Sequence, residues 1–428
     1  MLMRPLLCLL LTLSALAGTV EEARRPQAQA ALPGIGSAFA ELQSSFAQDW
    51  AKTEDSRAAT ALAQRYGRQL WQQARQRIHS QADFDDRPLY WARLGLSRTL
   101  REQSPAFPIF AADRQAAIAA LEWASRGMDD IAFPDDAQRP APARTGRSLP
   151  ALRILLTGFD PFLLDRRISQ SNPSGVNALL LDGAEFTVQA GGQPRRVHIE
   201  TAMIPVRQAD FDAGMIERLT LPWLSGHPIA RQDRLDAGRS TAPALPAGRA
   251  RPQIDMLVTV SMGRRDFDLE RFPGRRRSSS APDNDNVYSG GSLVAPILPN
   301  LGTQELSGAE FIEFSLPAKA MLTVQTPYAV HDNRWVRTLT EQRLAAGGLA
   351  ALQGKTAVEG SGGGYFSNEI SYRTLRLREQ LGLGSLPIGH IHTPAMGEFD
   401  PATLKAITGQ IRAMLEAAAA DLAAKPRR

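Results

Sequence analysis

Residues 153–162 read Arg153-Ile-Leu-Leu-Thr-Gly158-Phe159-Asp-Pro-Phe162. A short apolar run that ends at a glycine is typical of a buried strand that enters a loop. Further apolar runs of this kind lie at 198–204, 254–260 and 386–392. Helical patterns separate them, and buried strands that alternate with helices favour a mostly parallel sheet with helices on both faces. The sequence therefore predicts an α/β fold, a three-layer α/β/α domain with a mostly parallel sheet.

Two helices of this domain can be placed from the sequence. The last should begin at Asp400, because Asp is a good N-cap and Pro401 suits the first helical position. Its inner face should carry Leu404, Ile407, Ile411, Leu415 and Leu422. A second helix is expected over 368–381, directly after a glycine-rich turn. Ser367 would then stand at a helix N-terminus, where backbone N–H groups favour negative charge.

The chain before residue 150 has a different character. Residues 35–130 read as helices, and Leu62, Tyr66, Leu70, Ala74 and Ile78 recur every four residues along one face. The tryptophans at positions 50, 71, 91 and 123 indicate a compact helical unit with a core of its own. The proline-rich stretch 134–150 is expected to be a linker. The α/β domain should span 151–424 and carry a surface insertion at 227–252.

Residues 1–17 predict a secretory signal peptide. Arg4 precedes an apolar run, and Ala15-Leu16-Ala17 is a small-residue cleavage site. The apolar run is too short to span a bilayer, so no stable membrane insertion is expected. The chain has one cysteine, Cys8, and it lies inside this segment. The expected mature protein is therefore exported, periplasmic or extracellular, and free of thiols and disulfides.

Charge does not indicate a nucleic-acid partner. The formal net charge is +5 over 428 residues, and the basic residues gather in loops such as Arg275-Arg276-Arg277. Basic and aromatic residues do not interleave as they do on a single-strand binding platform. We expect no nucleic acid, a peptide or small amide as the ligand, and a possible homo-oligomer.

Four separated segments, taken in order, resemble pyroglutamyl peptidase I (pyrrolidone-carboxylate peptidase), a family of cysteine peptidases. The first is Thr157-Gly158-Phe159-Asp160-Pro161-Phe162, followed by Asn172-Pro173-Ser174. The resemblance implies that Phe159 and Phe162 sandwich a flat pyrrolidone ring, and that Asn172 belongs to the substrate site. Leu163-Leu164 replaces a glycine pair of the family pattern, which would narrow the mouth of the pocket.

The second and fourth segments would supply the acid–base residues. In the second, Gly263-Arg264 is followed by Glu270 at the family's spacing, and the resemblance makes Glu270 the acidic member of a triad. The fourth, Gly389-His390-Ile391-His392-Thr393-Pro394, makes His392 the general base, with His390 in place of an aromatic residue. Ser280 stands where the family usually has an arginine near the oxyanion.

The third segment is Ser361-Gly-Gly-Gly-Tyr-Phe-Ser367-Asn368, and it matches the family's nucleophile segment except that Ser367 replaces the cysteine. A thiol has a pKa of about 8.5 and ionises readily at a helix N-terminus. A hydroxyl must instead lose its proton to a base during attack. Ser367, His392 and Glu270 would then form a Ser-His-Glu triad.

Each of these residues also has a plain structural interpretation. Ser367 could serve only as an N-cap, and His392 only as a hydrogen-bonded strand histidine. Glu270 could belong to a surface ion pair with Arg271 or Arg264, and the phenylalanines could be ordinary core. His390 and His392 have a spacing compatible with a metal, but no third ligand is recognisable, so we expect neither metal nor cofactor.

Two functions remain open from the sequence. One is an exported hydrolase that cleaves an N-terminal pyroglutamyl or related amide bond. The other is a catalytically inactive protein of the same fold that binds a peptide or small ligand. The missing thiol and the missing arginine favour the second, whereas the retained histidine and glutamate favour the first.

Overall fold

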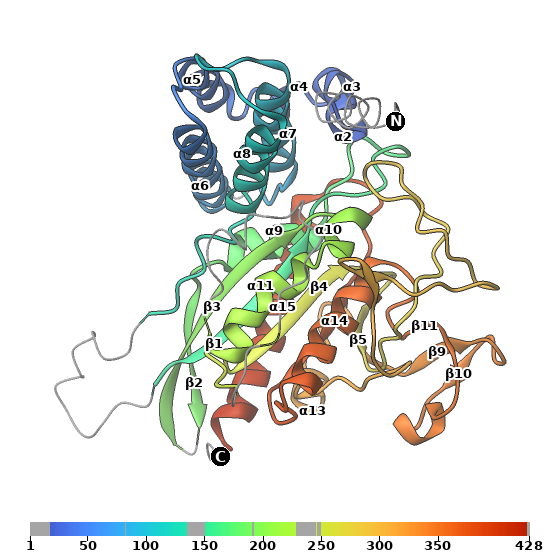
Figure 1. Cartoon of the computed structure of the whole chain (residues 1–428). Coiled ribbons are helices and arrows are strands. Elements are labelled where there is room, and N and C mark those ends of the chain that lie inside the picture. The colour runs from blue at the N-terminus through green and yellow to red at the C-terminus, as the bar shows by residue number, and fades with distance from the viewer. Residues whose placement is uncertain are drawn as a thin grey trace, which may run out of the picture.

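The computed structural model of the chain describes residues 18–81, 83–134, 150–190, 192–227, 245 and 250–425. The predicted signal peptide lies outside the described residues, as do most of the predicted linker and most of the insertion. The predicted α/β domain is present with an α-helical region before it (Figure 1).

The core of the molecule is a mixed sheet of seven strands in the order β2-β3-β1-β4-β12-β5-β8. The four central strands β3, β1, β4 and β12 run parallel, and β5 is antiparallel to β12. The strand bounds are β1 Leu152–Phe159, β2 Glu185–Ala190, β3 Gln193–Ile204, β4 Met256–Met262, β5 Phe267–Glu270, β8 Val330–Asn333 and β12 Ile388–Thr393. The four predicted strands are thus confirmed as β1, β3, β4 and β12.

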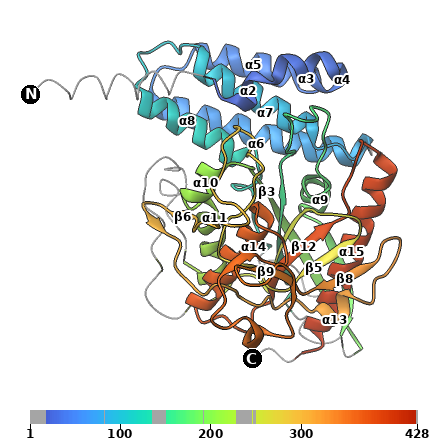
Figure 2. The same ribbon diagram turned by 90° about the vertical axis from the view of Figure 1, so that its right-hand side faces the viewer.

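Helices cover both faces of this sheet (Figures 1 and 2). One face carries α10 (Gln208–Asp212), α11 (Met215–Ser225) and α14 (Phe366–Gln380). The other carries α9 (Pro173–Leu181), α13 (Ala318–Met321) and α15 (Pro401–Ala423). Asp400 caps α15 as predicted, because its carboxylate accepts from the N–H groups of Ala402 and Thr403. The predicted inner face of α15 is buried at every position except Leu422, which is half-buried.

A small lobe beside β5 was not predicted. It contains a sheet of β9 (Trp335–Thr338), β10 (Leu344–Ala345) and β11 (Ala357–Glu359). The hairpin of β6 (Asn300–Leu301) and β7 (Gln304–Glu305), also not predicted, lies against α10 instead. The short 3-10 helix η2 spans Leu349–Leu352. The lobe has a small separate core, to which Phe272 and Val336 belong. These strands are too short for an alternating pattern to be recognised in the sequence.

The N-terminal helices are α2 (Val20–Ala23), α3 (Arg25–Ala31), α4 (Pro33–Gly36), α5 (Ala40–Ala51), α6 (Ser56–Gln81), α7 (Arg87–Glu102) and α8 (Ala111–Ala124). The helical region therefore starts earlier than the predicted residue 35. Thr19 and Glu22 form a capping box at α2, and buried Glu21 accepts from the Tyr90 hydroxyl. The capping box and this tertiary contact stabilise the segment before residue 35.

The buried residues of the helical region and of the α/β domain form one continuous core, and the division of the chain into two domains stays a prediction. The tryptophans at positions 50, 71, 91 and 123 are all buried, as predicted. Trp71 and Leu70 belong to the same cluster as residues of β1 and α9, and the Trp71 indole N–H donates to Asp182 at 3.1 Å. The helices pack near the carboxyl end of β1, since Arg93 of α7 pairs with Asp160 directly after that strand. Within the part of the chain that the structure describes, no helix is both long and apolar enough to cross a bilayer.

Candidate active site

A cavity of about 340 Å³ opens at the carboxyl ends of the central strands. Open α/β sheets bind their ligands at this edge. Five of the six predicted site residues line it: Phe159, Phe162, Asn172, Ser367 and His392. Other lining residues are Leu163, Val206, Ser261, Met262, Gly263, Arg264, Gly362, Tyr365 and Phe366.

Ser367 is the second residue of α14 and is half-buried at the cavity wall. The N-cap is Tyr365, so the interpretation of Ser367 as a mere N-cap is wrong. The backbone N–H groups of Phe366, Ser367 and Asn368 donate to no acceptor among the described residues. Such free N–H groups at a helix N-terminus stabilise an anion placed beside them.

The residues that flank Ser367 fix the turn before the helix. Asn368 accepts from the N–H of Gly274 at 2.8 Å and donates to its carbonyl at 2.7 Å. The Ser361 hydroxyl accepts from the N–H of Phe272 at 2.8 Å, and the Tyr365 hydroxyl donates to the Pro282 carbonyl at 2.6 Å. The motif residues around Ser367 therefore hold the segment against the neighbouring chain.

His392 and Glu270 form a buried pair at the ends of β12 and β5. The His392 Nδ1 lies 2.5 Å from Glu270 Oε1, and Asn333 donates its side-chain N–H to the other carboxylate oxygen at 2.8 Å. Burial raises the pKa of Glu270, and the neighbouring His392 counteracts that rise. Glu270 is 1% exposed, so it does not form the surface ion pair with Arg271 or Arg264 considered above. This pairing fixes the His392 tautomer with a bare Nε2, which is the form a general base requires.

Ser367 contacts a hydroxyl rather than His392. Ser261, from β4, donates to the Ser367 Oγ at 2.8 Å. Ser261 Oγ also lies 2.8 Å from His390 Nε2, and His390 Nδ1 lies 2.8 Å from the Thr259 hydroxyl. No hydrogen bond joins Ser367 to His392 across the described residues, although both line the cavity. In ligand-free enzymes such catalytic contacts are often long and shorten when substrate binds.

Phe159 and Phe162 both line the cavity, and their sandwiching of a pyrrolidone ring stays a prediction. Phe159 is buried and stacks on Phe211 with ring centroids 6.4 Å apart, whereas Phe162 is half-buried. Leu163 lines the cavity with a φ of 58°, in the left-handed region where the family pattern has glycine. Asn172 caps α9, and its carboxamide donates to the Asp160 carbonyl and accepts from Ser174. A contact between Asn172 and substrate stays a prediction.

Among the described residues that line the cavity, Arg264 is the one permanent cation. Arg264 is exposed and makes no ion pair within the described part of the chain. Arg275 and Arg276 pair with Glu310, and Arg277 pairs with Asp212 and Glu369. None of these three arginines lines the cavity, so they do not replace the arginine missing at Ser280.

No metal-binding cluster of three or more His, Cys, Asp or Glu side chains occurs among the described residues. The imidazoles of His390 and His392 lie 4.9 Å apart at an interplanar angle of 88°. His390 contacts Thr259 and Ser261, and His392 contacts Glu270.

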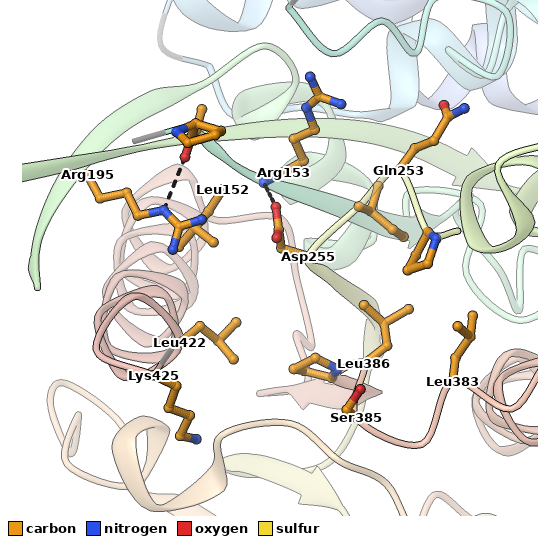
Figure 3. A pocket seen from close by; sticks show the side chains of 15 residues that line it. Leu152, Arg153, Arg195, Gln253, Asp255, Leu383, Ser385, Leu386, Leu422 and Lys425 are labelled. Atoms are coloured by element: carbon orange, nitrogen blue, oxygen red, sulfur yellow. Dashed lines mark hydrogen bonds between the residues drawn. The ribbon is translucent and has the colours of Figure 1, made fainter. Parts of the chain in front are cut away.

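A larger cavity, of about 740 Å³, lies at the opposite edge of the sheet (Figure 3). It is lined by residues that precede or begin β1 and by residues that precede β4 and β12, including Leu152, Gln253, Asp255 and Leu386. Figure 3 shows Asp255 accepting from the backbone N–H of Arg153. Its lining contains no histidine beside its one hydroxyl residue, Ser385, so the smaller cavity is the candidate site.

The models of two domain families match this chain, each over part of its length. Residues 8–122 match "PA0049 N-terminal domain", and residues 153–237 and 346–397 match "PA0049, C-terminal domain". The chain is similar to PA0049 over both regions. The Pseudomonas aeruginosa protein "Uncharacterized protein PA0049" is 28% identical over 423 residues, which cover 80% of this chain and 70% of that protein.

Solved structures of pyrrolidone carboxyl peptidase from Pyrococcus furiosus show a distant likeness. One mutant of that enzyme is 16% identical, covers 63% of this chain and 100% of its own, and has a TM-score of 0.36. A structure described together with a cys-free mutant is 15% identical over the same shares, with a TM-score of 0.37.

The structure adds two site residues that the sequence did not reveal. Ser261 lies two residues before Gly263, and Asn333 ends β8 far from every motif. Proximity to the glycine–arginine pair was a signal for Ser261, whereas Asn333 had none. The sequence places His390 where the family pattern has an aromatic residue and at a spacing compatible with a metal, but it gives no signal for the contact of His390 with Ser261.

Proposed function

We propose that this protein is an amide hydrolase of the pyroglutamyl-peptidase type in which serine replaces the cysteine nucleophile. The observation that supports it most is the buried 2.5 Å contact between His392 and Glu270. His392 lines the same cavity as Ser367. An ordinary strand histidine does not need a buried carboxylate, because burying the charge has a large desolvation cost. A triad, by contrast, requires that carboxylate.

The chemistry follows from the three positions. Ser367 Oγ attacks the carbonyl carbon of the scissile amide, and its proton passes to His392 Nε2. Glu270 accepts from the Nδ1–H and stabilises the imidazolium. The backbone N–H groups at the start of α14 and the Arg264 guanidinium are the donors available to the oxyanion. The imidazolium then protonates the leaving amine, and water hydrolyses the acyl ester by the reverse path.

The proposed substrate is an N-terminal pyroglutamyl group or a related small cyclic amide. Phe159, Phe162 and Tyr365 give the cavity flat apolar walls, and its volume suits a small ring. Leu163 narrows the space where the family pattern has glycine, which would favour a small or differently shaped acyl group. Export and a possible homo-oligomer remain part of the proposal and rest on the sequence alone.

The second candidate function is a catalytically inactive binding protein. The observation that favours it is that Ser367 accepts from Ser261 rather than contacting His392. A hydrolysis assay with a chromogenic pyroglutamyl amide separates the two functions. Under the first, turnover occurs and Ser367→Ala abolishes it. Under the second, the ligand binds in calorimetry and no amine is released.

Ser367→Cys is the sharpest variant. In a Cys8→Ser background it supplies the only thiol of the chain. If the cavity holds a pyroglutamyl ring, release of the amine should rise by at least about tenfold, since a thiolate forms near neutral pH. His392→Ala should then silence the Cys variant.

Ser371→Ala is the matched control for these variants. Ser371 is a buried serine on the same helix, and its hydroxyl has no hydrogen-bond partner in the described part of the chain. It should leave turnover unchanged. A Cys variant that binds the ligand and stays inert contradicts the hydrolase proposal.

A further inference from the structure

Four side chains form a continuous hydrogen-bonded chain that ends on Ser367 at the wall of the cavity. Its links are Thr259 Oγ1 to His390 Nδ1, His390 Nε2 to Ser261 Oγ, and Ser261 Oγ to Ser367 Oγ. Each link is 2.8 Å long. Thr259, Ser261 and His390 come from the adjacent parallel strands β4 and β12, and Thr259 lies opposite His390 in their register. The pairing of two neighbouring strands therefore sets the geometry.

The direction of these hydrogen bonds follows from which group donates the proton at each link. Ser261 gives its one proton to Ser367, so its oxygen must accept from an Nε2–H of His390. A neutral imidazole with a proton on Nε2 has a bare Nδ1. With Nδ1 bare, the Thr259 hydroxyl is the donor of the 2.8 Å contact between them; the Gly389 carbonyl, at 3.3 Å, is the longer of its two acceptors. All three donors point toward Ser367.

His390 is suited to this place because it is completely buried. Burial and, to a lesser extent, the neighbouring His392 lower the pKa of His390 well below its ordinary value. The ring is therefore neutral near pH 7 and carries a single N–H. A neutral ring can pass polarisation along the chain without placing a second positive charge beside His392.

We infer that Thr259, His390 and Ser261 activate Ser367 by donating a hydrogen bond to its oxygen and stabilising the negative charge that develops there during attack. The inference rests on the proposed role of Ser367 as nucleophile. Because the Ser367 oxygen accepts from Ser261, its own proton is left for His392. A hydrogen bond to an ionised acceptor is about twice as strong as one to a neutral acceptor, so the chain stabilises the attacking state more than the resting state.

Two departures from the family pattern, Ser367 in place of cysteine and His390 in place of an aromatic residue, then have one explanation. A thiol ionises with a pKa of about 8.5, whereas a hydroxyl ionises far less readily. The pattern that this chain resembles has an aromatic residue at the position of His390. Replacement of sulfur by oxygen at 367 and of that aromatic ring by His390 would thus be coupled, because the second change helps the oxygen carry charge. Ser261 and His390 act through Ser367 and are positioning residues.

The experiment measures how well position 367 stabilises negative charge. The full chain carries Cys8→Ser and Ser367→Cys, so that the only thiol reports on the site. The thiol pKa is read from the rate of alkylation by iodoacetamide as a function of pH. Adding Ser261→Ala should raise that pKa by at least about one unit, which is a tenfold loss in the ionisation constant. Adding Ser371→Ala, the buried serine one turn along α14, should leave the pKa where it was.

His390 variants test the next link. His390→Phe restores an aromatic residue without a donor and should raise the thiol pKa in the same direction, whereas His390→Gln keeps an N–H and should recover part of the effect. Equal thiol pKa values with and without the Ser261 hydroxyl would overturn the inference.

A measurement on the unmodified chain needs no variant to fold. A ¹⁵N–¹H correlation spectrum of histidine-labelled protein should assign the Nε2–H tautomer to His390. A proton on Nδ1 reverses the chain and overturns the inference.

Failure of the inference and failure of the proposed function give different results. Suppose that Ser261→Ala shifts the thiol pKa but the unmodified chain releases no amine from pyroglutamyl amides. The hydrogen-bond network is then supported and the peptidase function is contradicted. Turnover that depends on Ser367, together with a thiol pKa insensitive to Ser261→Ala, retains the peptidase and rejects the network.

Discussion

Glu270 is held by two partners and excluded from solvent. Its oxygens accept from His392 at 2.5 Å and from Asn333 at 2.8 Å. Because burial raises its pKa, the carboxylate protonates at a higher pH than an exposed glutamate does. A protonated Glu270 no longer stabilises an imidazolium, so catalysis should weaken as the pH falls through this raised pKa.

The corresponding variant is Glu270→Gln. The amide preserves shape but removes the charge and allows the wrong histidine tautomer, which in a comparable triad costs about 10⁴ in rate. We expect kcat to fall by about 10²–10⁴ while KM changes little, because Glu270 does not line the cavity. Steady-state kinetics over a range of pH check this. A variant that retains most of its kcat would remove Glu270 from the mechanism.

At the scale of elements, the turn before α14 decides where Ser367 points. A Cβ built on Gly360 would lie 2.1 Å from the Asn368 side-chain oxygen and 2.3 Å from the backbone nitrogen of Gly274. Backbone atoms cannot move aside without displacing the start of the helix. The glycine at this position is therefore required by close approach of two chain segments.

Gly360→Ala should thus destabilise the fold by about 1–3 kcal/mol, the usual cost of overpacking. It should also slow any reaction of Ser367. Gly362→Ala is the control within the same turn, because its added Cβ would meet nothing closer than 3.5 Å. Thermal unfolding of the two variants checks this. Equal melting temperatures would show that the turn has room to relax.

At the scale of the whole molecule, the N-terminal helices support the loops that wall the cavity. Arg93 of α7 and Arg126, which follows α8, both pair with fully buried Asp160, each at 2.8 Å. Asp86 accepts from the Ser171 hydroxyl at 2.6 Å and from the backbone N–H of Asn172. The segments around Asp160 and Asn172 are those that present the pocket residues.

Asp160→Asn tests this support. It leaves two buried arginines without their shared carboxylate, and breaking a buried pair in this way costs about 3–5 kcal/mol. Denaturant unfolding should show that loss, together with weaker ligand binding. Asp49→Asn removes an exposed ion pair with Arg65 and should change the unfolding free energy by less than about 1 kcal/mol. Similar losses in both variants would contradict a clamping role for the helices.

The buried carboxyl groups between the N-terminal helices and the α/β domain predict that stability depends on pH. Burial raises the pKa of Asp86 from 3.8 to about 8 and that of Glu21 from 4.5 to about 7. Between these values the folded protein holds protons that the unfolded chain has released. The unfolding free energy should therefore be highest below pH 4 as far as these two groups are concerned, and should fall as the pH rises toward 8.

Asp86→Asn should flatten that decline, because an amide does not titrate. Urea unfolding at pH 6 and pH 8.5 measures it in both proteins. A decline of the same size in the variant would assign the pH dependence to other groups.

Local patterns were enough to determine much of this protein. The apolar runs predicted the four central parallel strands, and Asp400-Pro401 predicted the start of α15. The motif residues came together at one cavity because parallel strands place their carboxyl ends at one edge. Each of these predictions depends on residues close in sequence or on a general rule of sheet topology.

Only the tertiary structure decided what Ser367 contacts and what the helices do. Ser261 lies 106 residues before Ser367 and 129 before His390. Asn333 reaches Glu270 because β8 pairs with β5. The helical region joined the main core through contacts such as that of Trp71 with Asp182, 111 residues away. Hydrogen bonds between distant residues follow from strand order and register, which no local pattern encodes, because propensity and periodicity report only on neighbours along the chain.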